Sequence, residues 1–371
     1  MSPNGQGPAA PSDDARPAAA DRLDHEELLV RRGPRTGIYV IVAVHSTALG
    51  PALGGARLWR YKTPGDAIAD ALRLSEAMTY KAAAAGLNLG GGKSVLCVER
   101  GLTIAARREL MLDLGEAVES LEGRYVVAED VGTTAADMAM VAERTSHVVG
   151  RPVEQGGSGD PSPVTARGVE AAMRVACEKE LGSPDLSGVR VCVIGLGHVG
   201  ANLAERLANA GAELLVSDID SSKRKLADRL GARWVKPARA ATVACDVLAP
   251  CALGGTIDRD NARRLRCRIV CGSANNALAD DSLADELDQL GILYAPDFIA
   301  NAGGLINVYA EIHGLERERT DRLVDGIGEA LGAVLRTAEE RSVTPLLAAR
   351  ELAAARLERA RRSDQPARLR A

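Results

Sequence analysis

Residues 189–220 read VRVCVIGLGHVGANLAERLANAGAELLVSDID, and this stretch decides the fold. It opens with Val189–Ile194, which is apolar apart from one arginine and predicts a buried strand. Three glycines in the spacing GxGxxG follow where the next helix begins: Gly195, Gly197 and Gly200. A second apolar run ends in Asp218, about 20 residues beyond the motif. Strand, glycines, helix, strand and acid in this order predict a doubly wound α/β domain that binds a dinucleotide.

The glycines and the acid together suit a nicotinamide dinucleotide. Glycines without side chains admit a pyrophosphate to the helix N-terminus, where free N–H groups and the helix dipole hold it. Asp218 is placed to accept hydrogen bonds from ribose hydroxyls and to repel a 2′-phosphate, which favours NAD over NADP. Lys223, Arg224 and Lys225 could bind that phosphate instead, although a solvated helix face is the simpler interpretation. His198, inside the motif, is interpreted as an exposed loop residue and not as a catalytic one.

Length and composition bound the remaining possibilities. A chain of 371 residues exceeds one ordinary core, so two domains are expected. The 46 basic and 50 acidic residues give a net charge of −4, which offers no basic field to nucleic acid. No apolar run reaches the roughly 18 residues that a membrane span needs. The seven cysteines form no CxxC pair, which indicates free thiols in a reducing cytoplasm and no metal site.

The chain divides where its composition changes. Residues 1–33 are rich in Pro, Ala, Asp and Arg and predict a disordered tail. Residues 34–155 form the expected N-terminal substrate and catalytic domain, and the Gly/Pro-rich segment 150–163 is the expected hinge. Residues 164–344 form the expected Rossmann NAD-binding domain, and the helix 345–362 is expected to pack back on the first domain. The predicted fold is therefore α/β in two domains with a cleft between them.

A second unusual stretch, MTYKAAAAGLNLGGGKSV at Met78–Val95, holds two lysines in apolar, glycine-rich surroundings. Lys81 lies in the last turns of a predicted amphipathic helix, and Lys93 follows three glycines whose bare backbone would let another molecule approach. Two cations in a dry setting suit the capture of a carboxylate, or a lysine whose pKa is low enough for a base. The alternative is an ordinary solvated lysine near a helix end. The glycines of Gly50–Leu58 likewise predict an open backbone or a sharp turn.

Asp130 follows a predicted strand, YVVAE, and is a third candidate. Sites in α/β proteins gather at strand ends, so this carboxylate could join the two lysines. A turn or helix-cap role is the alternative that the local sequence leaves open.

Several blocks of the chain resemble the leucine, valine and phenylalanine dehydrogenases, which belong to the glutamate dehydrogenase superfamily. The blocks are GPALGGARLW, ALRLSEAMTYKAAAAGLNLGGGKSV, YVVAEDVGTTAADM, GDPSPVTARGV, VIGLGHVG, CDVLAPCALGG and APDFIANAGG. The resemblance runs from about Gly37 to Arg350. It implies reversible NAD-dependent oxidative deamination of an L-amino acid to a 2-oxo acid and ammonia. The chain departs from the family pattern at GPRTGIYVIVAV and at His198.

The resemblance also implies roles for individual residues. Lys81 would pair with the substrate carboxylate, Lys93 would be the general base, and Asp130 would take part in the proton transfers. The backbone of Gly54 would help to hold the carboxylate. The implied substrate pocket is aliphatic or small: Leu53, Ala128, Leu305 and Val308. The implied cofactor contacts are Thr165, Gly195, Leu196, Gly197, His198, Val199, Gly200, Asp218 and Asn275.

The resemblance leaves the substrate open. A branched-chain amino acid, leucine, valine or isoleucine, is the main hypothesis, and an aromatic one, phenylalanine or tryptophan, is the alternative. A catalytically silent NAD-binding protein is a third hypothesis, disfavoured because both lysines and Asp130 are present. The family makes homo-oligomers, so a homo-oligomer is expected, with no nucleic-acid or membrane partner and no metal.

Overall fold

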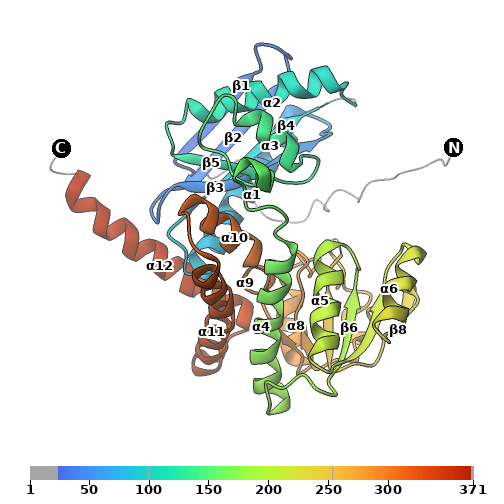
Figure 1. The fold of residues 1–371 in the computed structure, drawn as a ribbon. Coiled ribbons are helices and arrows are strands. Elements are labelled where there is room, and N and C mark those ends of the chain that lie inside the picture. The colour runs from blue at the N-terminus through green and yellow to red at the C-terminus, as the bar shows by residue number, and fades with distance from the viewer. Residues whose placement is uncertain (1–23, 99–100, 253, 369–371) are drawn as a thin grey trace.

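The chain forms two α/β lobes, each built on one sheet (Figure 1). The structure, a computed structural model, describes residues 24–98, 101–252 and 254–368. A five-stranded sheet forms the N-terminal lobe and a six-stranded sheet forms the C-terminal lobe. The predicted two-domain α/β class is therefore confirmed. No helix in the described part of the chain is long and apolar enough to cross a bilayer.

The N-terminal sheet has the strand order β1-β2-β4-β3-β5. Its strands are β1 (Glu27–Arg32), β2 (Tyr39–Ser46), β3 (Ala52–Trp59), β4 (Gly90–Cys97) and β5 (Tyr125–Glu129). Its helices are α1 (Pro64–Ala84), α2 (Ile104–Glu119) and α3 (Ala135–Val141). Side chains of β2 alternate between the faces, because successive residues of a strand point to opposite sides. Ile41 and Ala43 pack with α1, whereas Val40, Val42 and Val44 pack with α2.

Two predictions for the N-terminal lobe are wrong. Residues 27–32, inside the predicted tail 1–33, form β1, which pairs antiparallel with β2. Their short apolar run is flanked by charges, so composition alone resembles a tail. Residues 1–23 lie outside the described residues. The segment Gly50–Leu58 was expected to be an open backbone or a sharp turn. Gly50 does close a turn, in which its N–H donates to the carbonyl oxygen of Thr47, but residues 52–58 belong to β3, an internal strand that runs parallel to both β4 and β5.

The sequence suggested that the glycines of β4 let another molecule approach. In the structure, neighbouring parts of the protein itself occupy the space beside them. A Cβ on Gly90 would lie 1.9 Å from the carbonyl oxygen of Ser46, in the loop after β2. One on Gly91 would lie 2.1 Å from the backbone nitrogen of Thr79, in α1. One on Gly92 would lie 2.5 Å from the ring of Tyr125. Because neighbouring elements press on this strand from several sides, residue 93 is held in one position.

The C-terminal sheet is wholly parallel, in the order β11-β10-β9-β6-β7-β8. Its strands are β6 (Arg190–Ile194), β7 (Glu213–Ser217), β8 (Arg233–Trp234), β9 (Val247–Pro250), β10 (Ile269–Val270) and β11 (Leu293–Tyr294). The helices are α4 (Ser162–Leu181), α5 (His198–Asn209), α6 (Arg224–Arg229), α7 (Pro237–Ala240), α8 (Leu283–Gln289), α9 (Asp297–Ala300), α10 (Gly303–Ile312), α11 (Arg317–Arg341) and α12 (Pro345–Arg368). The glycine motif follows β6, where the strand order reverses, which is the usual ligand position in such sheets.

The segment that joins the lobes is tied to α10 by one carboxylate. Glu311 accepts hydrogen bonds from the backbone N–H of Gly150 at 3.0 Å and of Ser158 at 2.9 Å. It also accepts one from the Ser158 hydroxyl at 2.7 Å. The predicted hinge, residues 150–163, is therefore fastened at two points. The domain limits 34–155 and 164–344 remain predictions.

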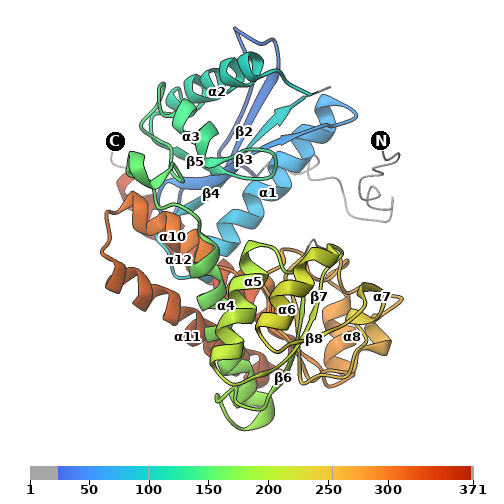
Figure 2. The same ribbon diagram turned by 45° about the vertical axis from the view of Figure 1, so that its right-hand side comes forward.

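Helix α12 returns from the C-terminal lobe to the end of α1 (Figure 2). Arg356 donates hydrogen bonds to the carbonyl oxygens of Ala83, at 3.0 Å, and Gly86, at 2.9 Å. It also donates to the side-chain oxygen of Asn88 at 3.0 Å. The last carbonyls of a helix have no partner within it, so this guanidinium satisfies the end of the helix that carries Lys81.

Gly54→Ala tests the close packing of β3 on β4. A Cβ at residue 54 would lie 1.8 Å from the carbonyl oxygen of Gly92, and neither backbone can yield without parting the strands. We expect the free energy of unfolding to fall by about 1–3 kcal/mol or more, measured by urea denaturation. The control is Gly326→Ala in α11, where a Cβ meets nothing within 4 Å. It should gain about 0.5–1 kcal/mol, and equal stability of the two variants would contradict this account.

Candidate functional site

Lys93 and Asp130 meet in the N-terminal lobe, where Asp130 directly follows β5. Lys93, on β4, is only 5% exposed, and its Nζ donates to Oδ2 of Asp130 at 2.7 Å. The same oxygen accepts a hydrogen bond from Nε of Arg57, on β3, at 3.0 Å. Asp130 does not cap α3, whose N-cap is Thr134. The carboxylate that the sequence left open as a possible cap therefore bridges two cations.

The contacts continue outward as a row of alternating charges. Nη1 of Arg57 donates to Oδ2 of Asp70, on α1, at 3.0 Å. Tyr61 donates to that oxygen at 2.6 Å, and Arg73 donates to the other oxygen at 2.7 Å. Asp70 thus holds Arg57 from the far side, and Arg57 holds Asp130. The row fixes the position of the carboxylate that Lys93 contacts.

Burial and charge act against each other on Lys93. Loss of hydration disfavours the ammonium and lowers its pKa, while Asp130 opposes that shift by direct contact. Arg57 repels the ammonium, and the pKa of Lys93 ends below its ordinary value. Burial raises the pKa of Asp130, but Lys93 and Arg57 together hold it below its ordinary value. The site therefore combines an ionised carboxylate with an amine that gives up its proton readily.

Lys81 lies beside this pair, near the C-terminal end of α1. The helix has Thr63 as its N-cap, and Asp66 completes a capping box. Burial lowers the pKa of Lys81 to about 8, with repulsion from Lys93 in the same direction and attraction to Asp297 against it. In the described part of the chain no carboxylate oxygen lies within 4 Å of its Nζ. Lys81 is thus a half-buried cation available to an anion from outside the protein.

The residues expected to form the substrate pocket belong to, or border, one large hydrophobic cluster. Leu53 and Leu305 are buried members of one hydrophobic cluster, against which Ala128 and Val308 pack. Leu53 and Ala128 come from β3 and β5, whereas Leu305 and Val308 come from α10 in the other half of the chain. Next to Leu53, the carbonyl oxygen of Gly54 accepts a hydrogen bond from the hydroxyl of Tyr125 at 2.9 Å. The predicted aliphatic surface therefore lies between elements of both lobes.

The glycine motif has the geometry that a pyrophosphate needs. Gly195 has φ +97°, a conformation that favours glycine, and a Cβ on Gly200 would lie 1.9 Å from the carbonyl oxygen of Gly195. Gly197 is the N-cap of α5, has no side-chain capping bond, and faces open space. His198 is exposed at the first turn, as interpreted from the sequence, with Val199 half-buried behind it. Free N–H groups at an uncapped helix start fit a dinucleotide phosphate.

The ribose and nicotinamide ends have suitable polar groups as well. Asp218 directly follows β7, and its Oδ2 accepts from the backbone N–H of Leu196 at 2.6 Å, so the acid adjoins the glycine motif. On the other side, Asn301 donates to the side-chain oxygen of Asn275 at 2.8 Å. The Oδ1 of Asn301 is buried without a hydrogen-bond partner, which fits a donor on a bound molecule. Thr165 lies against Gly303 and Gly304 at the start of α10, and its hydroxyl donates to the carbonyl oxygen of Pro161 at 2.9 Å. These residues fit NAD.

Comparison with known proteins agrees with this arrangement. The family described as Glu/Leu/Phe/Val dehydrogenase, dimerisation domain, matches residues 30–147. The family described as Glutamate/Leucine/Phenylalanine/Valine dehydrogenase matches residues 216–364. The chain belongs to this dehydrogenase family. Residues 166–253 also match the NAD binding domain of the D-isomer specific 2-hydroxyacid dehydrogenases, and the cofactor of the chain is NAD.

Full-length relatives support the same family. The chain is 42% identical to a leucine dehydrogenase of Bacillus subtilis (strain 168) over 92% of its own length and 94% of that protein. It is 40% identical to a valine dehydrogenase of Streptomyces virginiae over 92% of its length and 96% of that protein. The crystal structure of L-tryptophan dehydrogenase from Nostoc punctiforme matches with a TM-score of 0.81 at 37% identity, over 91% of this chain and 97% of that one.

Three residues of this dehydrogenase site were not singled out from the sequence. Arg57 lies within the GPALGGARLW block, but an arginine after glycines has no local signal of its partner. Asp297, whose pKa burial raises, opens α9 and acts on Lys81 by charge from the other lobe. Asn301 lies within the APDFIANAGG block, where nothing in the local sequence indicates its partner Asn275. Each becomes informative only when distant elements are brought together.

Arg57→Gln tests whether the guanidinium lowers the pKa of Lys93. The variant removes the repelling charge and leaves Asp130 to Lys93 alone, so we expect the pKa of Lys93 to rise. The measurement is a ¹³Cε titration of lysine-labelled protein by NMR, assigned with Lys93→Arg. Arg60→Gln makes the same change of charge on an exposed side chain and should leave the titration unchanged. An unchanged or lower Lys93 pKa in Arg57→Gln would contradict this assignment.

Proposed function

We propose that the chain catalyses the reversible NAD-dependent oxidative deamination of a branched-chain L-amino acid to its 2-oxo acid and ammonia. The single observation that carries this proposal is the buried Lys93–Asp130 pair with the half-buried cation of Lys81 beside it. Similarity to a leucine and a valine dehydrogenase over more than 90% of the chain supports it. When bound, NAD accepts a hydride from the α-carbon of the amino acid.

In this proposal Lys81 binds the substrate carboxylate. An ammonium with no protein carboxylate within 4 Å, in partly dehydrated surroundings, attracts an anion more strongly than a solvated one does. Gly54 adds backbone contact to the same carboxylate. The ammonium of Lys81, which is fixed on α1, then orients the α-carbon. Arg356 donates hydrogen bonds to the carbonyl oxygens at the end of this helix.

Lys93 acts as the general base. Loss of hydride leaves a cationic imine on the substrate, and a water molecule must lose a proton as it attacks that carbon. The neutral amine of Lys93 takes this proton, and its lowered pKa keeps a larger neutral fraction at a given pH. Asp130, 2.7 Å away, receives a hydrogen bond from the resulting ammonium and stabilises it. The row through Arg57 and Asp70 holds this carboxylate still.

The pocket residues set the choice of substrate. Leu53, Ala128, Leu305 and Val308 offer aliphatic contact and no polar group for a substrate side chain. An apolar pocket separates substrates that differ by one methylene by only about 1–3 kcal/mol, so activity on several branched-chain amino acids is expected. The similarity to L-tryptophan dehydrogenase supports an aromatic substrate as the second candidate.

The assembly and location of the protein are also proposals. We infer a homo-oligomer in the cytoplasm, supported by the description of the first family as a dimerisation domain. The partners are then the amino acid, the 2-oxo acid and ammonia.

A substrate panel in both directions, followed by NADH absorbance, tests the proposed function. We expect kcat/KM to be higher for leucine, valine and isoleucine than for phenylalanine and tryptophan. Lys93→Ala should lower kcat by about 10²–10⁴ for every active substrate and leave NADH affinity unchanged, since Lys93 lies in the other lobe from the glycine motif. Lys62→Ala removes an exposed lysine and should change neither quantity.

Each contrary result of this panel has a definite meaning. Preference for phenylalanine or tryptophan would replace the branched-chain proposal with the aromatic one. NADH binding without reduction of any 2-oxo acid in ammonia would leave a silent binding protein. Full turnover by Lys93→Ala would remove the proposed base.

The pKa of Lys81 predicts an alkaline limit to substrate capture. Its ammonium is charged below about pH 8 and loses its charge above that pH, so kcat/KM for the amino acid should fall above about pH 8. Lys81→Arg keeps the charge at all working pH values and should move this limb to higher pH. The substrate amino group titrates equally with both proteins and cancels in the comparison. Identical alkaline limbs would show that Lys81 does not bind the carboxylate.

A further inference from the structure

A cavity on the outer edge of the C-terminal lobe is lined by cations and has no role in the proposed function. It lies between β8, the edge strand, and the connection from α7 to β9, with a volume of about 710 Å³. Its charged lining consists of Arg233, Lys236, Arg239 and Arg266. None of the glycine-motif residues, the two site lysines or the pocket residues lines it. Figure 1 shows β8 beside α6, at the edge of this lobe that is farthest from α4 and α11.

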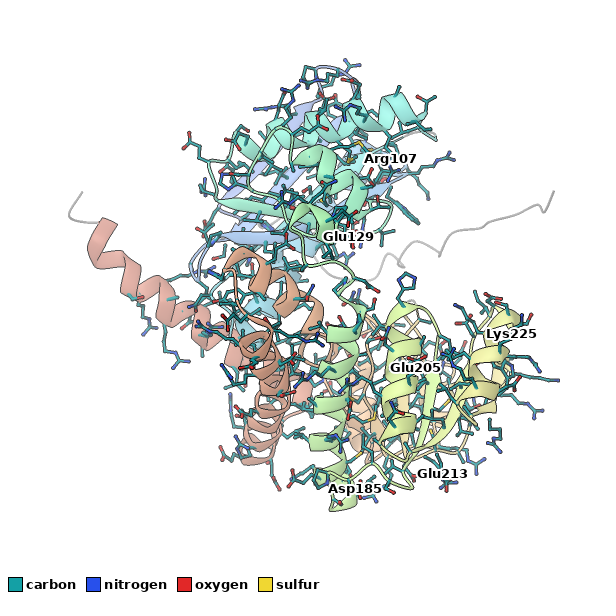
Figure 3. The ribbon with its side chains drawn as sticks, viewed as in Figure 1. Arg107, Glu129, Asp185, Glu205, Glu213 and Lys225 are labelled. Atoms are coloured by element: carbon teal, nitrogen blue, oxygen red, sulfur yellow. The ribbon has the colours of Figure 1, made fainter. Side chains whose placement is uncertain are left out.

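The four lining cations have no acidic partner among the described residues. Other arginines of this lobe are paired with carboxylates, as with Arg229 and Glu205 on α5, the second of which Figure 3 labels. Further pairs of this kind are Arg263–Glu286, Arg268–Glu180 and Arg190–Asp246. In residues 24–98, 101–252 and 254–368, no carboxylate lies within 4.0 Å of the four lining cations, and no Asp or Glu lines the cavity.

The cavity lining contains four cations and no acidic residue, although the chain as a whole is slightly acidic. Acidic residues outnumber basic ones by 50 to 46, so partners for these cations are not scarce. Four positive charges that face one hollow repel each other and produce a potential of one sign, which the concave walls focus. A ligand with several negative charges would relieve that repulsion. A ligand with one negative charge would leave most of the repulsion between the four cations in place.

The residue types narrow the ligand further. Guanidinium groups bind phosphate through two parallel N–H···O bonds, and three of the four cations are arginines. The indole of Trp234 forms part of the wall, and the guanidinium of Arg224 lies 5.0 Å from its ring centre. A volume of about 710 Å³ suits a small molecule and not a folded partner.

We propose that this cavity binds an oligophosphate, the row of linked phosphate groups that nucleoside di- and triphosphates and inorganic polyphosphate share. Arg233, Lys236, Arg239 and Arg266 contact the phosphate oxygens, and Trp234 offers an aromatic surface beside them. The site is separate from the glycine motif, which takes the pyrophosphate of NAD. The proposal does not depend on the substrate of the enzyme, because it concerns binding alone.

Trp234 makes the test direct, because the chain has two tryptophans and the other, Trp59, is in the N-terminal lobe. Trp59 is 45% exposed, so Trp59→Phe should fold and leave Trp234 as the only indole. Titration of this variant with inorganic tripolyphosphate at low ionic strength should change the fluorescence saturably. Calorimetric titration of the unaltered protein measures the same affinity without any substitution.

Charge variants locate the binding. Arg239→Gln with Arg266→Gln should weaken tripolyphosphate binding at least about tenfold, since two of the four guanidinium and ammonium groups that contact the phosphate oxygens lose their charge. Arg319→Gln with Arg322→Gln, on exposed positions of α11, makes the same change of net charge and should leave the affinity unchanged. Both double variants should bind NADH with the affinity of the unaltered protein. Equal weakening by the two pairs would reduce the effect to overall charge and overturn the proposal.

Two further ligands distinguish the sources of the phosphate. If ATP binds more tightly than tripolyphosphate and shifts the Trp234 emission further, a nucleotide is the ligand; if the two are equal, the phosphate chain alone is recognised. Both results support the site. Orthophosphate as tight as tripolyphosphate would overturn it, as would no saturable signal or heat. Displacement of tripolyphosphate by NADH would place the binding at the glycine motif and would also overturn it.

Discussion

Taking an ammonium out of water is the constraint on which this structure depends. Lys93 is almost wholly buried, and an unpaired charge there would be lost as the neutral amine or would unfold its surroundings. Asp130 keeps the charged form accessible, but Arg57 draws on the same oxygen, so the pairing is weaker than an exclusive one. The outcome is an amine that can exist in either protonation state, as proton transfer requires.

The glycines of the N-terminal lobe serve this constraint. A dry site forms only where the backbone elements touch, and Gly54, Gly91 and Gly92 allow β3, α1 and Tyr125 to reach β4. The same contacts fix Lys93 against Asp130 and bring Lys81 next to them on α1. Lys81 is left without an acid within reach, so the site contains one cation that the protein neutralises and one that it does not. The proposed division of roles between the two lysines rests on that difference.

The features that were predictable from the sequence are those with a local signal. The GxGxxG motif and Asp218 lie within one strand–helix–strand unit, and Lys81 and Lys93 stand out because their neighbours are apolar. The strand β1 was missed because its apolar run is short, and β3 was missed because glycines usually interrupt strands. Arg57, Asp297 and Arg356 were missed for another reason: their partners are distant in sequence, and no alternation or spacing points to them. The sequence therefore indicates residues with unusual neighbours, but it does not indicate which distant residues form contacts with each other.

The contact between Arg356 and the end of α1 has a consequence for the order of assembly. Residue 356 is made after every strand of both sheets, yet it completes the hydrogen bonds of the helix that carries Lys81. During synthesis the first lobe can therefore form its sheet while the carbonyls around Ala83 still face water. The surroundings of Lys81 become final only when almost the whole polypeptide has left the ribosome, so a nascent chain with a folded first lobe is not yet a competent one.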